Sequence, residues 1–126
     1  MQLYRAMKAA DDALPVTEAT ARGLGARPGV DIPLVDGMVA PAIGGMSVTV
    51  DDPSKLPRHR LPARMGGEGR DPVFHLDRAQ LPATLVVRRD EPRAAYHAFV
   101  EPALRCSFAD YQSDIQSTRA QWRMLR

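Results

Sequence analysis

The stretch DGMVAPAIGGMSVTV, residues 36–50, runs from a loop of small residues into an alternating strand. Gly44 and Gly45 stand directly before residues 46–50, where apolar and polar side chains alternate. Such alternation predicts a half-buried β-strand with Ser47 on its polar face. Two glycines permit close approach to the backbone, so a ligand could press against the main chain and meet the Ser47 hydroxyl first. A tight turn ahead of a half-exposed strand explains the same residues.

Outward from this stretch, the chain predicts more strands than helices. Runs rich in apolar and β-branched residues predict strands at 2–7, 72–76, 83–89 and 94–101. Thr17 predicts the start of a short helix, because a threonine can cap the first turn. Asp52-Pro53 predicts a helical turn within residues 51–57.

Residues 107–125 carry the clearest helical pattern. Apolar and small side chains recur there at steps of three and four, at Phe108, Tyr111, Ile115, Thr118, Trp122 and Leu125. Ser107 followed by Asp110 resembles a capping box with the shorter acid. We interpret the stripe as core packing rather than a coenzyme surface. Because no strand–helix–strand alternation appears, the sequence predicts an α+β fold in which one helix closes a mostly antiparallel sheet.

Length and composition set broad limits. The chain has 126 residues, 44% of them hydrophobic, which predicts a single domain over residues 1–126 with a real core. Its 17 basic and 15 acidic residues give a formal charge of +2. This charge is too close to balance to indicate nucleic-acid binding, although it does not exclude such binding. One cysteine, Cys106, excludes an intramolecular disulfide and a zinc site built from several thiolates.

The three histidines lack the spacing of metal ligands, so we expect no metal. There is no signal-peptide pattern and no apolar run approaching about 18 residues. We therefore expect a soluble protein made in the cytoplasm, without a membrane segment.

Arg5 is the first candidate for chemistry. On a strand it shares a face with Leu3 and Met7, so a planar cation lies between apolar neighbours. Such an arginine is paired to an acid or available to an anion, since its fork fits phosphate and carboxylate. An edge-strand arginine that lies over the core with its head in water explains the same pattern.

The segment AAYHAFVEP, residues 94–102, offers further candidates. His97, Phe99 and Glu101 share one face of the predicted strand. Glu101 lies at the end of the strand, a common place for a side chain that acts on a ligand. A solvated face with one aromatic residue is the alternative.

Two basic groups also stand out. Arg119, Arg123 and Arg126 fall on one stripe of the predicted last helix, where cations are favourable near the C-terminus; a docking surface for an acidic partner is the alternative. The basic segment 55–64 could steer a phosphate-bearing ligand or serve as a solubilising loop.

These elements occur in a recognisable order. An arginine in the first strand, a serine after small residues and a glutamate ending a later strand resemble the Arg, Ser-Thr-Ser and Glu elements of ADP-ribosyltransferases. Over most of its length the chain is similar to the Tse2-type toxins, ADP-ribosyltransferase-like effectors that bacteria deliver by type VI secretion. The resemblance is carried by LYRA at 3–6, DGMVAPAIGGMSV at 36–48, VFHLDRAQLPATLVVRRD at 73–90, HAFVEPA at 97–103 and RAQW at 119–122.

The resemblance implies a split, mostly antiparallel sheet of the ADP-ribosyltransferase type with a long C-terminal helix and a cleft for NAD. It implies an NAD-dependent ADP-ribosyltransferase that transfers ADP-ribose to a component of the target cell, or that hydrolyses NAD. Arg5 would bind the pyrophosphate, Ser47 would support the cleft or the acid, and Glu101 would stabilise positive charge on the ribose as nicotinamide leaves. The implied cofactor-binding residues are Tyr4, Arg5, Gly44, Gly45, Met46, Ser47 and His97.

The resemblance also implies partners. An antibacterial effector of this kind is delivered by secretion machinery or a carrier, acts on a target macromolecule in the target-cell cytoplasm, and is neutralised by a cognate immunity protein. Two alternatives stay open. The chain could keep the fold without the chemistry and act by protein contact, or it could modify RNA, which the basic segment 55–64 would suit.

Overall fold

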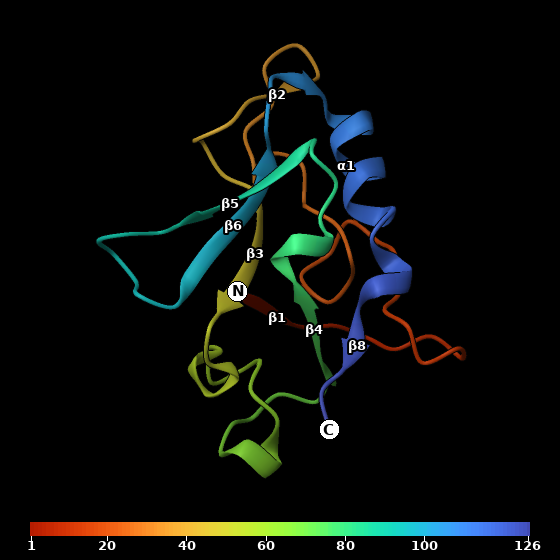
Figure 1. Cartoon of the computed structure of the whole chain (residues 1–126), viewed down its shortest axis with the longest axis vertical. Helices are drawn as coiled ribbons and strands as arrows, with labels where there is room; N and C mark the ends of the chain where they lie inside the picture. The colour runs from red at the N-terminus through yellow and green to blue at the C-terminus, as the bar shows by residue number, and fades with distance from the viewer.

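A six-stranded antiparallel sheet forms the body of the protein in the computed structural model, which describes residues 1–126 (Figure 1). In spatial order its strands are β5 (Leu85–Arg89), β6 (His97–Pro102), β3 (Met46–Val50), β1 (Gln2–Ala6), β4 (Val73–Asp77) and β8 (Arg123–Met124). A second sheet pairs β2 (Met38–Val39) with β7 (Cys106–Ser107). The expected α+β class and mostly antiparallel sheet are confirmed.

The strand that opened the sequence analysis lies in the middle of this sheet. Met46, Val48 and Val50 are buried in the main hydrophobic cluster, as their alternation predicts. A smaller cluster of four buried residues, Ala6, Leu56, Leu61 and Val73, holds the 51–65 segment against the sheet. That segment contains the 3-10 helices η1 (Pro53–Lys55) and η2 (Ala63–Met65), and Asp52 caps η1 as expected.

The sheet opens between its two central strands. β1 pairs with β4 over all five of its residues, and β3 pairs with β6 over four. Between β1 and β3, in contrast, only Leu3–Val50 and Tyr4–Thr49 are paired, and the strands then separate. The side chain of Arg5 reaches across this opening and donates to the carbonyl of Ser47.

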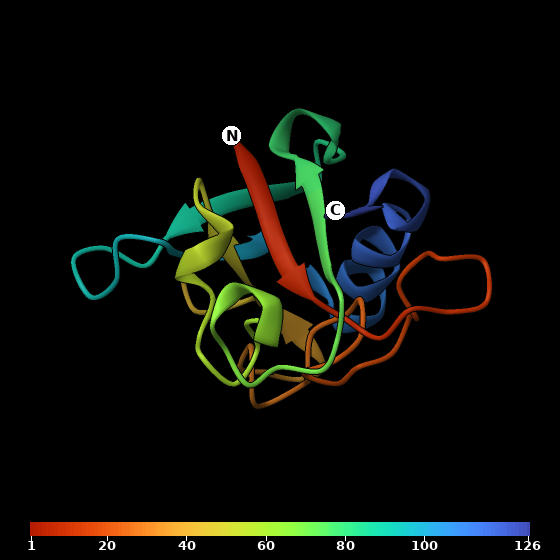
Figure 2. The ribbon, with the colours of Figure 1, turned by 90° about the horizontal axis from the view of Figure 1, so that it is seen from below.

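Helix α1 (Phe108–Gln116) follows β7 and runs along one side of the molecule (Figure 1; Figure 2 shows it from below). The Ser107 hydroxyl accepts a hydrogen bond from the Asp110 amide, as the capping pattern predicts. The Tyr111 hydroxyl fastens the helix to the sheet, because it donates to the carbonyl of Val100 and accepts from the amide of Met46.

The expectation of one helix over 107–125 is wrong, because α1 ends at Gln116. The Thr118 hydroxyl donates to the carbonyl of Ile115 and accepts from the indole of Trp122, which directs the chain out of the helix. A 3-10 helix, η4 (Arg119–Gln121), follows, and the chain then joins the sheet as β8. The predicted stripe of helical arginines is therefore absent.

The short helix expected from Thr17 is also wrong, since no helix forms there. The amide of Val16 donates to the carbonyl of Lys8, and the amide of Leu24 donates to the carbonyl of Val16. This irregular path turns the carbonyl groups of Gly23 and its neighbours toward Arg5. Contacts with a distant side chain thus override the local capping signal.

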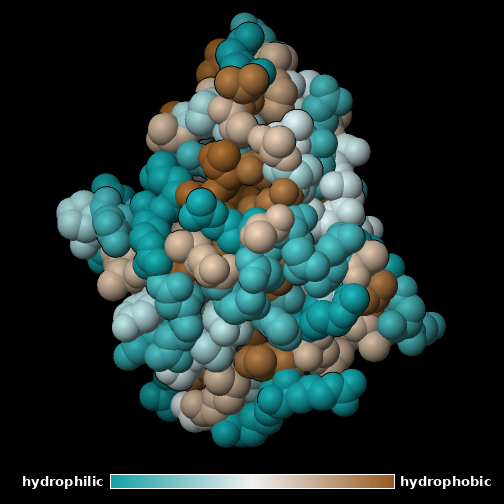
Figure 3. Space-filling model, viewed as in Figure 1, coloured by the Kyte–Doolittle hydropathy of each residue, from teal (hydrophilic) through white to brown (hydrophobic).

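The surface differs between the two ends of the molecule. Exposed apolar side chains lie in the loops around the small sheet, at Val30, Leu34, Val35, Ile43 and Leu104. An apolar area is visible in the upper half of the face shown in Figure 3. No helix is both long enough and apolar enough to span a bilayer.

Candidate functional site

A cavity of about 220 Å³ lies at the opening between β1 and β3. It is lined by polar, charged and apolar side chains, namely Tyr4, Arg5, Ala6, Ala21, Arg27, Asp31, Ser47, Val48, Thr49, Leu56, Pro57, His59, Arg60 and His97. Three arginines and one carboxylate are among them, so the lining carries an excess of positive charge.

Arg5 forms the floor of this cavity and is only 7% exposed. Its guanidinium donates to the backbone carbonyls of Ser47 at 2.7 Å, Gly23 at 2.9 Å, Thr20 at 3.3 Å and Gly25 at 3.4 Å. No carboxylate pairs with it. Burial lowers the pKa of Arg5 from its usual value to about 10, so the group is still charged at neutral pH. Its hydrogen bonds are satisfied while its charge is not neutralised.

Arg60 is also a partly buried arginine whose hydrogen bonds go to backbone carbonyls. Its guanidinium donates to the carbonyls of Ala6 and Ala21, and its nearest carboxylate, Asp71, is 3.7 Å away. Burial is the largest cause that lowers the pKa of Arg60, and the positive charge of Arg22 lowers it further. Arg5 and Arg60 therefore give the cavity two cations whose hydrogen bonds go to neutral groups.

Arg27 and Asp31 form the one ion pair in the lining. The Arg27 guanidinium lies 3.0 Å from the Asp31 carboxylate, which also accepts a 2.7 Å hydrogen bond from the Arg27 amide. This contact raises the pKa of Arg27. Asp31 is the only acidic side chain that lines the cavity.

Four of the residues proposed from the sequence converge here. Tyr4, Arg5, Ser47 and His97 all line the cavity, although they come from three different strands. The ring of His97 lies 3.1 Å from the Asp90 carboxylate through its Nδ1 atom. The polar face of β3 and the matching face of β6 thus contribute to one hollow.

Glu101 does not line the cavity. It is buried on the same face of β6 as His97, where its carboxylate accepts a 2.9 Å hydrogen bond from Arg88 and a 3.1 Å hydrogen bond from the amide of Ala42. The Arg88 guanidinium also lies over the ring of Phe99, 4.9 Å from its centroid. The acid and the cation of this second region therefore neutralise each other.

Gly44, Gly45 and Met46 also lie outside the lining. A Cβ atom at Gly44 would lie 2.4 Å from the carbonyl oxygen of Asp31, and one at Gly45 would lie 2.5 Å from that of Val100. Both glycines have positive φ angles, 149° and 159°. In this structure the two glycines make room for the protein's own backbone, and Met46 belongs to the core.

Sequence reasoning did not single out Arg27, Asp31 or Thr49 as site residues. Arg27 and Asp31 lie in a loop whose RPGVD sequence signals only a turn. Arg60 was within the basic segment 55–64, so its charge was visible although its place beside Arg5 was not. The arrangement as a whole suits an anionic ligand that also has a ring or apolar part.

No family model, no curated protein and no solved structure matches this chain.

Proposed function

We propose that this chain is an ADP-ribosyltransferase-like toxin that binds NAD in the cavity between β1 and β3. The observation that carries the proposal is the Arg5 guanidinium, which is buried in the lining of the cavity, bonded to the Ser47 carbonyl and without a carboxylate in ion-pair contact. A fixed cation in a partly desolvated hollow is a strong attractor for a pyrophosphate. The opening between β1 and β3 is consistent with the split sheet that the sequence resemblance implies.

The lining fits the parts of a dinucleotide. Arg60 would donate charge-assisted hydrogen bonds to the pyrophosphate, and Arg5, whose donors are engaged by backbone carbonyls, would add the field of a second cation. Tyr4 and His97 would border a ring, and Ser47 would present a hydroxyl between them. Bound NAD would supply a ribosyl–nicotinamide bond that is activated for cleavage.

The lining also offers an acid. Asp31 and Glu101 are both ion-paired, with Arg27 and Arg88 respectively, but only Asp31 lines the cavity. We therefore assign to Asp31 the role that the resemblance gives to Glu101, which is to stabilise positive charge on the ribose. In this step the bond from ribose to nicotinamide breaks, nicotinamide leaves with the electron pair, and an acceptor hydroxyl or water bonds to the ribose and loses its proton.

The biological setting follows the sequence resemblance. As an antibacterial effector delivered by type VI secretion or a carrier, the chain would modify a target macromolecule in the recipient cytoplasm. A cognate immunity protein would neutralise it in the producing cell.

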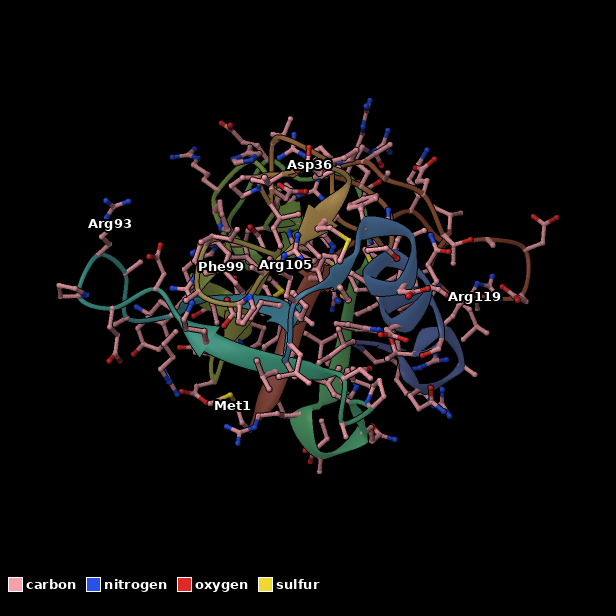
Figure 4. All side chains as sticks on the ribbon, turned by 90° about the horizontal axis from the view of Figure 1, so that it is seen from above. Met1, Asp36, Arg93, Phe99, Arg105 and Arg119 are labelled. Carbon is pink, nitrogen blue, oxygen red and sulfur yellow. The ribbon has the colours of Figure 1, made fainter.

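The proposal is tested by NAD binding and nicotinamide release. Asp31→Asn should bind NAD and release nicotinamide at least about tenfold more slowly than wild type, because it removes the charge that the ribose requires. Ser47→Ala should weaken both steps. Arg93→Gln serves as the matched control, since Arg93 lies at the exposed tip of the β5–β6 hairpin (Figure 4). If the folded wild-type chain neither binds NAD nor releases nicotinamide while it still kills cells, the enzymatic proposal is wrong.

Glu101 is bonded to Arg88 outside the cavity, so the acid expected from the resemblance is missing from the cavity lining. This observation favours a second candidate, a toxin that keeps the fold and acts by protein contact. In that case toxicity survives Asp31→Asn and Ser47→Ala. It is lost instead when the charge of the exposed Arg123 is reversed.

A further inference from the structure

A second cavity, of about 340 Å³, adjoins the first. The two share three lining residues, Ala6, His59 and Arg60. The second cavity is otherwise polar, and its remaining lining residues are Arg22, Glu68, Gly69, Arg70 and Asp71. Since Ala6 is its one hydrophobic residue, this hollow suits a charged group rather than a ring or an aliphatic chain.

The acids of the second cavity already have partners. The Asp71 carboxylate is buried and accepts two hydrogen bonds from Arg22, at 2.6 and 2.7 Å. Glu68 lies 3.4 Å from Arg58, a side chain outside the lining. Neither acid is therefore free to balance the other cations of the cavity.

Two cations remain in excess. Arg60 donates its hydrogen bonds to backbone carbonyls, and its only carboxylate neighbour is the one that Arg22 already occupies. Arg70 is exposed and forms no ion pair or side-chain hydrogen bond within the chain. Arg60 and Arg70 thus border one hollow in which their shared acid, Asp71, is already hydrogen-bonded to Arg22, which is an arrangement that attracts a phosphate.

We propose that the second cavity binds a phosphate group beyond the pyrophosphate held in the first cavity. A ligand that passes Arg60 would place its pyrophosphate near Arg5 and its further phosphate near Arg70. Two sources supply such a group: the third phosphate of NADP, or a phosphodiester of a nucleic-acid strand that serves as the acceptor. The inference rests on the proposed function, because that function identifies the nucleotide in the first cavity. The positive charge of the second cavity does not depend on it.

The test compares three probes on the full chain: NAD, NADP and a short single-stranded RNA, each titrated by calorimetry at two salt concentrations. Arg70→Gln is the test variant, because Arg70 is exposed and its loss leaves the fold intact. Arg70→Lys keeps the charge, and Arg93→Gln removes a distant exposed arginine as the matched control (Figure 4).

If the dinucleotide is the source, wild type binds NADP roughly tenfold more tightly than NAD, and Arg70→Gln removes that difference while leaving NAD binding unchanged. If a strand is the source, NAD and NADP bind equally. RNA then binds with an affinity that falls with salt, and Arg70→Gln lowers the slope of log K against log salt by about 0.7. In both cases Arg70→Lys retains much of the effect and Arg93→Gln changes nothing.

Two results separate this inference from the proposed function. A chain that binds NAD and NADP equally and binds no RNA overturns the second phosphate site and leaves the proposed function standing. A chain that binds RNA through Arg70 but binds neither dinucleotide supports the second site and overturns the proposed function. Arg70→Gln that binds all three probes as wild type does also overturns the inference.

Discussion

Arg5 and Glu101 are both buried charges near the centre of the sheet, and the protein accommodates them in opposite ways. Arg5 donates to the carbonyls of Ser47, Gly23 and their neighbours, which are neutral groups. Glu101 accepts from a cation, Arg88, as well as from a backbone amide. Arg5 keeps its charge and lines a cavity, whereas the charge of Glu101 is balanced by Arg88 and Glu101 lies outside that lining.

The difference shows how a buried charge can serve structure, function or both. A hydrogen bond to a carbonyl satisfies a donor without cancelling its field, so Arg5 still attracts an anion. The charge of Arg88 offsets the field of Glu101, and Glu101 also lies outside the cavity lining, so it has little to offer a ligand there. Arg5 and Glu101 look equally functional in the sequence. The groups that contact each side chain in the fold distinguish their roles.

The largest effect should come from Arg5→Met. It leaves the carbonyls of Ser47 and Gly23 without their buried donor, and we expect the free energy of unfolding to fall by about 3 kcal/mol or more. Arg5→Lys, which keeps the charge and some of the bonds, should lose less. Urea unfolding monitored by circular dichroism measures both variants. A loss under about 1 kcal/mol for Arg5→Met would show that Arg5 does not hold the opening together.

Glu101→Gln should lower the free energy of unfolding by about 2 kcal/mol. Glutamine can still accept from the Ala42 amide but cannot balance Arg88, whose side chain is 36% exposed and so partly hydrated. In a double-mutant cycle with Arg88→Met, the two losses should sum to more than the loss in the double variant. Additive losses would mean that Glu101 and Arg88 are not coupled, and the contrast with Arg5 would disappear.

Asp71 allows the comparison of paired and unpaired buried charges to be made as a pH dependence of stability. Hydrogen bonds from Arg22 are the largest cause that lowers the pKa of the Asp71 carboxyl in the folded state. The resulting stabilisation is fully present above the unfolded pKa of about 3.9 and is lost as pH falls through the lower folded pKa. Asp71→Asn should therefore flatten the acid side of the stability curve. Arg5→Lys should leave that acid dependence unchanged, because the acceptors of Arg5 are carbonyls.

A modest effect should come from stabilisation by an anion. Pyrophosphate at about ten times its dissociation constant should stabilise wild type by about 1.4 kcal/mol, seen as a rise of a few degrees in melting temperature. Glu101→Gln should keep this rise, since Glu101 lies outside the cavity, while Arg60→Gln should lose most of it. Equal rises in the two variants would mean that the anion binds elsewhere.

Much of the fold was predictable from local pattern. The alternation at residues 46–50 gave β3 with the observed bounds, and Ser107 gave the start of α1. The end of α1 was not predictable, because Thr118 and Trp122 continue the helical spacing while their side chains bond to each other and to Ile115. The helix expected at Thr17 failed for a related reason, since the chain there is shaped by Arg5.

The candidate site was predictable only in part. Arg5 and Ser47 were found because an arginine between apolar residues and a serine after two glycines are visible in the sequence. Asp31 was not found, since a loop acid carries no local sign of the cavity that it faces. Gly44 and Gly45 were noticed because glycine allows close backbone approach. The groups that approach them, the carbonyls of Asp31 and Val100, are brought there only by folding.

The sequence by itself determined the approximate places of β1, β3, β4, β5 and β6 and the start of α1, because alternation and capping act over a few neighbouring residues. Only the tertiary structure decided which charges meet. Arg5 donates its shortest hydrogen bond to the carbonyl of Ser47, 42 residues away, and Glu101 accepts from its cation across a hairpin. Charge compensation is a property of groups brought together by folding, so no local pattern could distinguish the cation that stays available from the acid that does not.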